Sequence, residues 1–253
     1  ALLSLFVVYP VLRSMASAWV DDLGAHAWSH LWQRLATERV WSLGCLSGHR
    51  CGVAWNTLGL ALATALRSPC MGLLLALWAE RVQTRLAAPL NVLALLPIIT
   101  PPFVVGLGLI LLFGRAGLFN QFLEWAFGIP PTRWFYGFFG VWLAQMFAFT
   151  PIAFMILRGV VQGVSPSMEE AAQTLRASRW QTFVTVTLPL LKPGLANAFL
   201  VGFIESMADF GNPIILGGAY SVLSTEIFFA IVGAALDPGM AAALALLLTV
   251  FAL

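Results

Sequence analysis

Two carboxylates stand in an otherwise apolar stretch near the C-terminal end of this 253-residue chain. Glu205 and Asp209 are four residues apart, a spacing that places both on one face of a helix. A charge in the hydrocarbon interior of a membrane is costly, so such a pair indicates a functional site. In one interpretation, Glu205, Asp209 and the nearby Asn212 form the polar lining of a path across the membrane. In the alternative interpretation, they hold neighbouring helices by ion pairs or hydrogen bonds.

A basic residue, Arg67, lies about midway along another apolar stretch, just before Ser68 and Pro69. An unpaired arginine at this depth destabilises a membrane helix, and Glu205 or Asp209 could pair with it. Alternatively, the helix is tilted and the long side chain of Arg67 reaches the membrane surface.

The polar segment 21–55 holds two cysteines and all three histidines of the chain. If this segment lies in the periplasm, a disulfide between Cys45 and Cys51 is predicted, with two free thiols as the alternative. His26 and His30 have a spacing that can bind metal on a helix, but only His49 could add a ligand nearby. We therefore predict no metal site. No zinc-protease pattern or set of nucleophile and base indicates an enzyme.

The composition indicates a membrane protein. Hydrophobic residues make up 60% of the chain and charged residues only 9%, against about 25% in soluble domains; the mean hydropathy is +0.89. The net charge of +2 does not suggest nucleic-acid binding. Lipid cannot bond to backbone groups, so spans must be helices or closed barrels, and the long continuous apolar runs favour helices. The expected fold class is an all-α integral membrane protein.

The apolar runs predict a six-span helical core in a single transmembrane domain, 1–253. The last run is shorter than the roughly 20 residues that a span needs, and the first resembles the second part of a span, so we expect a fragment cut in both. Pro97, Pro101 and Pro102 should bend the third span, and the short run 226–236 should lie along the membrane surface. The first span is expected to end near Val20 and the sixth to start near Met240, with the others at 56–79, 89–113, 135–157 and 194–216.

The distribution of basic residues gives only a weak indication of which loops face the cytoplasm. One side would hold six Arg and Lys residues and the other five, so the positive-inside rule gives only a slight preference. That preference places 158–193 in the cytoplasm and 21–55 in the periplasm.

Segment 166–193 is polar, although it lies between two apolar runs. Ser165 can cap a helix that begins at Pro166, and Ser178 with Gln181 forms a second capping-box pattern. Pro189 and Pro193 should end the second helix before the fifth span. The first helix carries Glu169 and Glu170 in its first turn and an apolar stripe at helical spacing. The stripe either docks a partner or covers the chain's own bundle; it consists of Met168, Ala171, Ala172 and Leu175.

The order Glu170-Ala171-Ala172, followed by Leu188-Pro189 and Pro193, resembles the EAA loop of ABC-importer permeases. Further short motifs resemble the ferric-iron-type branch of that family over roughly residues 50–253. They are Asn56-Thr57, the proline-rich third span, Asp209-Phe210-Gly211-Asn212-Pro213 with Gly217-Gly218, and Ser224-Thr225-Glu226-Ile227.

The chain departs from the family pattern at one position. Arg176 stands where the pattern has glycine, four residues after the second alanine. Glycine permits a left-handed turn, so Arg176 predicts a more regular helix end with its cation near the negative end of the helix dipole.

The resemblance implies a permease that works by alternating access. Residues 166–180 would couple it to a cytoplasmic ATPase through Met168, Glu169, Glu170, Ala171, Ala172, Leu175 and Arg176. ATP and Mg would bind to that partner and no cofactor to this chain, which lacks a phosphate-binding glycine-rich loop. A periplasmic binding protein would deliver the substrate, and a second permease half, fused or separate, would complete the core in the inner membrane.

The substrate expected from the resemblance is ferric iron, with a phosphonate, a polyamine or thiamine as alternatives. A secondary transporter or channel is the alternative of a different class. Such a protein would not need the capped hairpin, and it would often show an inverted repeat.

Overall fold

A computed structural model describes residues 6, 8–19, 28–47, 51–81, 87–234 and 236–253. In these ranges the chain is helical and has no named strand. This confirms the all-α fold class. At the N-terminal end, short helices precede the first long one; they are α1 Tyr9–Ala16, η2 Ser17–Trp19, α2 Trp28–Leu35, α3 Glu38–Trp41 and η3 Gly44–Ser47.

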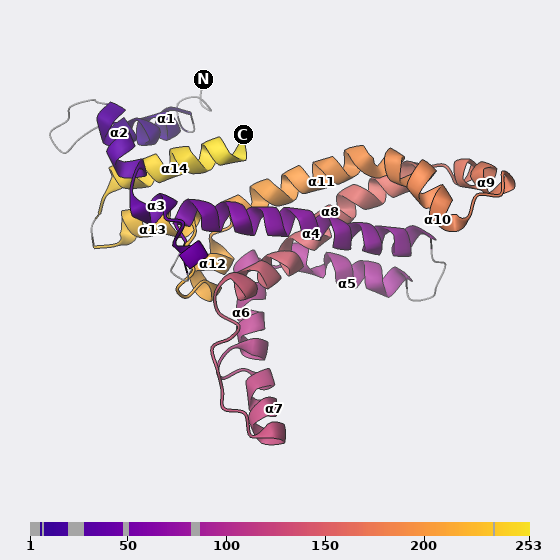
Figure 1. The fold of residues 1–253 in the computed structure, drawn as a ribbon, viewed down its shortest axis with the longest axis horizontal. Helices are drawn as coiled ribbons and strands as arrows, with labels where there is room; N and C mark the ends of the chain where they lie inside the picture. Colours follow the sequence, from indigo (N-terminus) through magenta and orange to yellow (C-terminus); the bar gives the residue numbers. More distant parts are fainter. Residues whose placement is uncertain (1–5, 7, 20–27, 48–50, 82–86, 235) are drawn as a thin grey trace.

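Figure 1 shows long helices that run along the molecule and shorter ones at both of its ends. The middle of the chain forms α4 Val53–Arg81, α5 Ala87–Ile99, α6 Pro102–Phe113, α7 Leu118–Phe127 and α8 Phe138–Gly163. The remainder forms α9 Pro166–Thr174, α10 Arg179–Thr182, the π-helical turn η4 Phe183–Thr187, α11 Leu188–Ala208, α12 Gly211–Leu216, α13 Leu223–Val232 and α14 Pro238–Ala252.

Within the described ranges, four helical segments are long and apolar enough to cross a membrane. They are Val53–Arg81, Phe103–Phe127, Phe138–Gly163 and Arg179–Ala208. The predicted first span lies partly outside the described residues, and its described part holds only the short α1 and η2. The start of the predicted sixth span corresponds to the 15-residue α14.

Helices α4, α8 and α11 pack together as the centre of the bundle (Figure 1). Glycines bring their backbones close. A Cβ at Gly72 of α4 would lie 2.8 Å from the backbone of Phe154 in α8, and one at Gly202 of α11 would lie 3.0 Å from the Ser68 hydroxyl in α4. Small residues at helix interfaces are how membrane helices gain packing energy without a hydrophobic driving force. The core between them is apolar and includes Ala76, Ala153, Phe154, Leu157 and Leu191.

The predicted third span is not one helix. It breaks at Thr100 and Pro101 into α5 and α6, with Pro102 among the first residues of α6. A proline disfavours the helical conformation of the residue before it and cannot donate to the preceding turn. Pro97 lies inside α5, whereas Pro101 and Pro102 separate α5 from a new helix, so α6 and α7 leave the direction of α5 (Figure 1).

The predicted fifth span starts much earlier than Gly194. Helix runs without interruption from Arg179 to Ala208, so the prediction that Pro189 and Pro193 would end a separate surface helix is wrong. The turn η4 lies just before Pro189, and there the Leu188 N–H bonds to the Phe183 carbonyl five residues back. A π-helical turn shifts the bonding by one residue, which accommodates the proline without a break.

Candidate functional site

Helix α9 projects beyond the long helices at one end of the molecule (Figure 1). It begins at Pro166 after Ser165, as the sequence predicts, but the Ser165 side chain makes no capping bond to the backbone. The second cap forms as predicted: the Ser178 hydroxyl accepts from the Gln181 N–H at 3.2 Å, and the Gln181 side chain accepts from the Ser178 N–H at 2.8 Å.

The predicted apolar stripe of α9 is largely uncovered by its own chain. Met168 is 47% exposed and Leu175 84% exposed; Ala171 is also exposed, and Ala172 is half-buried. An apolar stripe that covers its own bundle would be buried, which disfavours that alternative. Glu170 is exposed as well, so α9 presents a surface of apolar and acidic side chains away from the bundle.

Arg176 does not give the regular helix end that its residue type predicts. It adopts the left-handed conformation, with φ of 63°. The Arg176 N–H bonds to the Gln173 carbonyl at 2.9 Å, and the Ala177 N–H bonds to the Ala172 carbonyl at 3.2 Å. These two bonds make a Schellman turn, a helix ending that usually has glycine at this position. The arginine therefore adopts a conformation that glycine would adopt at lower cost.

A buried polar network lies within the bundle, around Gln145 of α8. The Gln145 carbonyl oxygen accepts from Thr64 of α4 at 2.9 Å and from the Ser206 hydroxyl of α11 at 2.7 Å. Its amide donates to the Asp209 carboxylate at 3.0 Å. Gln145 is fully buried, so one side chain joins three helices. Sequence reasoning missed Gln145, although a lone polar amide within an apolar span was a visible signal.

Asp209 ends α11 and organises the break that follows. Its carboxylate accepts from the Asn212 side chain at 2.9 Å and from the Asn212 N–H at 3.2 Å. Its backbone carbonyl accepts from Ser224 of α13 at 2.8 Å. The side-chain carbonyl oxygen of Asn212 is buried and has no hydrogen-bond partner. The structure therefore brings Asp209 and Asn212 together at the break that follows α11.

Glu205 and Asp209 do not share an orientation. Asp209 is buried, whereas Glu205 is exposed and is not part of the interior of this chain's own bundle. The expectation of one common face assumed a helix through both residues, but α11 ends at Ala208 and Asp209 has an extended backbone. The two side chains still line one hollow of about 270 Å³, together with Phe103 and Phe149.

Arg67 makes neither of the predicted ion pairs. It is exposed, and its guanidinium lies 5.9 Å from the centre of the Trp142 ring. This is within cation–π range. Asp209 is held by amides instead, and the ion pairs found within the described part of the chain leave out Arg67.

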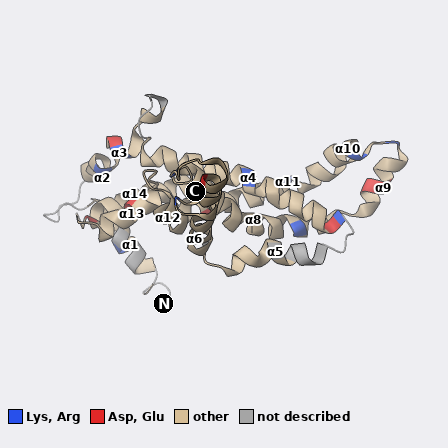
Figure 2. Cartoon of the chain, turned by 90° about the horizontal axis from the view of Figure 1, so that it is seen from below, with Lys and Arg blue, Asp and Glu red and all other residues tan. Residues whose placement is uncertain are grey.

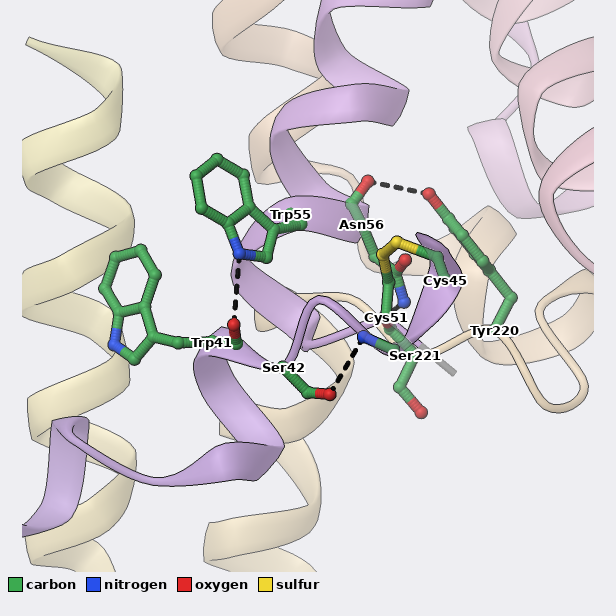
Figure 3. The surroundings of a disulfide bond; sticks show 9 residues. Trp41, Ser42, Cys45, Cys51, Trp55, Asn56, Tyr220 and Ser221 are labelled. Atoms are coloured by element: carbon green, nitrogen blue, oxygen red, sulfur yellow. Dashed lines mark hydrogen bonds between the residues drawn. A yellow bond between two sulfur atoms is a disulfide. The ribbon is translucent and has the colours of Figure 1, made fainter. Parts of the chain in front are cut away.

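The other end of the bundle holds the Cys45–Cys51 disulfide, with 4.7 Å between the Cα atoms. Figure 3 shows it beside the start of α4, near Tyr220 of the α12–α13 connection. The Tyr220 hydroxyl donates to the Asn56 carbonyl at 2.7 Å, and the Asn56 amide donates to the Ser221 carbonyl at 2.9 Å. Burial raises the pKa of Tyr220, which keeps the phenol a neutral donor.

These residues surround a pocket of about 880 Å³, which both cysteines line. His26 and His49 lie outside the described residues, and no cluster of metal-ligating side chains occurs within the described ranges.

Comparison with known proteins agrees with the bundle and the α9 hairpin. Residues 71–253 match the family model described as binding-protein-dependent transport system inner membrane component. The chain is 42% identical over 253 residues to the ferric transport system permease protein FbpB of Actinobacillus pleuropneumoniae, and 42% identical over 252 residues to the putative ferric transport system permease protein FbpB 1 of Haemophilus influenzae. Both alignments cover 100% of this chain, but only 35% and 38% of those two proteins.

A solved structure has the same fold. The chain superposes with a TM-score of 0.76 on a chain of a bacterial alginate ABC transporter that was crystallised in complex with an alginate pentasaccharide-bound periplasmic protein. The match covers 99% of this chain and 86% of that one, at 19% sequence identity. With a family match over most of its length and four apolar helices long enough to span, this chain is a multi-pass inner-membrane protein and belongs to the family of binding-protein-dependent transport system inner membrane components.

Proposed function

We propose that this chain is one permease half of an ATP-driven importer and that α9 docks it onto a cytoplasmic ATPase. The observation that carries this proposal is the uncovered stripe of α9, because Met168 and Leu175 stay exposed at the end of a folded bundle. A short amphipathic helix with exposed apolar anchors suits a groove on a protein partner. The ATPase would bind ATP and Mg, and its movement would reach the bundle through α9.

The remaining partners follow from the family. The two ferric transport relatives are roughly three times as long as this chain, which supports a second permease half fused to this one. A periplasmic binding protein would deliver substrate to the opposite end of the bundle from α9, the end that carries the disulfide.

The path for the substrate would run along the face that holds Glu205, Asp209 and Asn212. Glu205 is exposed on this half, and a path between two halves requires polar groups on the surface of each. Asp209 and Asn212 would shape the helix break beside it. An isolated carboxylate facing lipid would be costly, which supports a partner surface over Glu205.

Ferric iron is the proposed substrate, because both relatives at 42% identity are named as ferric transport permeases. Another small substrate, such as a phosphonate, a polyamine or thiamine, is the second candidate. Uptake of radiolabelled ferric iron, in competition with each of these compounds, distinguishes them. Uptake that needs an ion gradient but no ATPase would instead indicate a secondary transporter.

The docking role of α9 is tested on the full-length protein. Glu170→Lys and Ala172→Trp should abolish both uptake and co-purification of the ATPase, while the protein still inserts in the membrane. Thr132→Lys is the control, because Thr132 is exposed but lies in the α7–α8 connection, outside the helices that could cross the membrane. Normal ATPase co-purification and uptake with the two α9 variants would refute the proposal.

A further inference from the structure

Two residues of opposite charge end α4, and each reaches a different element. Glu80 lies 2.6 Å from the Arg158 guanidinium in α8. Arg81 lies 2.9 Å from the Glu169 carboxylate in α9. Figure 2 shows acidic and basic residues side by side where α9 meets the bundle. Both pairs are partly shielded from water, since the two glutamate side chains are each 21% exposed.

The oxygen of Glu169 that binds Arg81 also accepts a hydrogen bond from Thr187, at 2.9 Å. Thr187 is buried in η4, the turn that leads into α11. One carboxylate oxygen therefore joins the first turn of α9 to the end of α4 and the start of α11. Carboxylate bonds to charged donors are shorter and stronger than bonds between neutral groups.

Little else holds α9 to the bundle. The helix has no buried residue, so its apolar packing against the chain is slight. Its two adjacent glutamates also differ in orientation: Glu169 is half-buried against α4 and η4, and Glu170 is exposed on the outer surface. A push on α9 thus reaches the spanning helices mainly through the backbone at its ends and through Glu169.

We propose that Glu169 is a positioning residue that transmits movement of α9 to α4 and α11 through Arg81 and Thr187. This inference rests on the proposed docking of α9 to an ATPase. It gives the two glutamates different roles, because Glu170 belongs to the surface that meets the partner and Glu169 belongs to the linkage within this chain. Loss of the linkage should uncouple ATP hydrolysis from transport without releasing the ATPase.

The test uses the full-length protein with its ATPase and binding protein in proteoliposomes, and measures substrate taken up per ATP hydrolysed. Glu169→Gln keeps the size of the side chain and an acceptor for Thr187 but removes the charge. We expect the ratio to fall by about fivefold or more, the lower end of typical coupling between sites. Co-purification of the ATPase should remain normal. Arg81→Met breaks the same contact from α4 and should give the same result.

Two further variants separate coupling from simple stabilisation. Arg158→Met breaks the neighbouring pair with Glu80, which joins α4 to α8 and does not involve α9; it should leave the ratio unchanged. The exchange of Arg81→Glu with Glu169→Arg restores an ion pair and should recover part of the ratio that each single change loses.

The inference is overturned if Glu169→Gln and Arg81→Met keep the normal ratio. It is also overturned if they lower the ratio no more than Arg158→Met does. Failure of the underlying function looks different, because then no ATPase co-purifies with the unmodified protein.

Discussion

Two polar regions tie the same three long helices together, and they differ in how far water reaches them. The Gln145 network lies within the bundle, with Gln145 and Thr64 fully buried. The ion pairs of Glu80 and Arg81 lie at the end of α4, with their side chains 21 to 34% exposed. The first region uses mostly neutral groups in complementary pairs, and the second uses full charges.

The difference follows from solvation. A buried group without a partner keeps its full desolvation penalty, so the network around Gln145 tolerates no loss of a member. A partly hydrated ion pair gains little free energy, because water competes for each charge. The buried region should therefore control stability, whereas the exposed end can exchange partners during movement.

The largest effect is expected for Gln145→Leu. The change leaves the Thr64 and Ser206 hydroxyls and one oxygen of Asp209 with fewer partners, and should lower the free energy of unfolding by about 3 kcal/mol. Thermal unfolding in detergent measures it. Gln121→Leu is the control, since Gln121 is exposed and bonds only to a carbonyl five residues away. Equal melting temperatures for the two variants would contradict the assigned role of the network.

The Cys45–Cys51 disulfide allows the stabilisation by a covalent cross-link to be compared with that of the buried hydrogen bonds. Replacing both Cys45 and Cys51 by serine should cost about 2 kcal/mol, as estimated from the closure entropy of so short a loop. The effect should be smaller than that of Gln145→Leu, and it should appear in the unmodified protein on addition of reductant. Thiol labelling of both cysteines before reduction would show that no bridge forms.

The exposed ion pair should respond to salt, and the buried network should not. Arg158→Met is expected to lower the free energy of unfolding by about 0.5 kcal/mol at low ionic strength. The difference from the unmodified protein should shrink in concentrated salt, because screening weakens exposed charges. The cost of Gln145→Leu should stay constant over the same series. A salt-dependent cost for Gln145→Leu would remove the distinction between the two regions.

The smallest expected effect is a gain. Arg176→Gly replaces a residue held at φ of 63° by the one that adopts this conformation freely. We expect α9 to end more stably by about 0.5 kcal/mol, part of which is lost to the greater freedom of glycine in the unfolded chain. Slower amide exchange at the N–H groups of Arg176 and Ala177, which close the turn, would show it. Faster exchange would mean that the arginine side chain contributes more than its backbone conformation costs.

Local signals in the sequence predicted much of the α9 hairpin. The start of α9 at Pro166 and the capping box of Ser178 and Gln181 depend on residues one to three positions apart, so composition and spacing determine them. The long apolar runs likewise predicted α4 and α8, because lipid leaves a continuous apolar segment little choice but a helix. The motifs around Glu170 and Asp209 also sufficed to predict the family.

Proline was the local signal that the sequence left ambiguous. Three prolines were expected to bend the third span, but Pro97 lies inside α5 and the helix breaks at Pro101 and Pro102. Two were expected to stop a helix, but Pro189 and Pro193 both lie within α11. Whether a missing backbone donor breaks a helix depends on what packs around it, and that is not encoded within one turn of the chain.

Only the tertiary structure decided which polar groups meet. Thr64 and Gln145 are 81 residues apart, and Arg81 and Glu169 are 88 residues apart. No periodicity within a helix specifies such pairs, since they depend on how helices dock. Because α11 ends at Ala208, Asp209 leaves the helix and is buried, whereas Glu205 stays exposed. The sequence determined where helices can form and which carry charge, and the packing of α4, α8 and α11 determined which of those charges and amides act together.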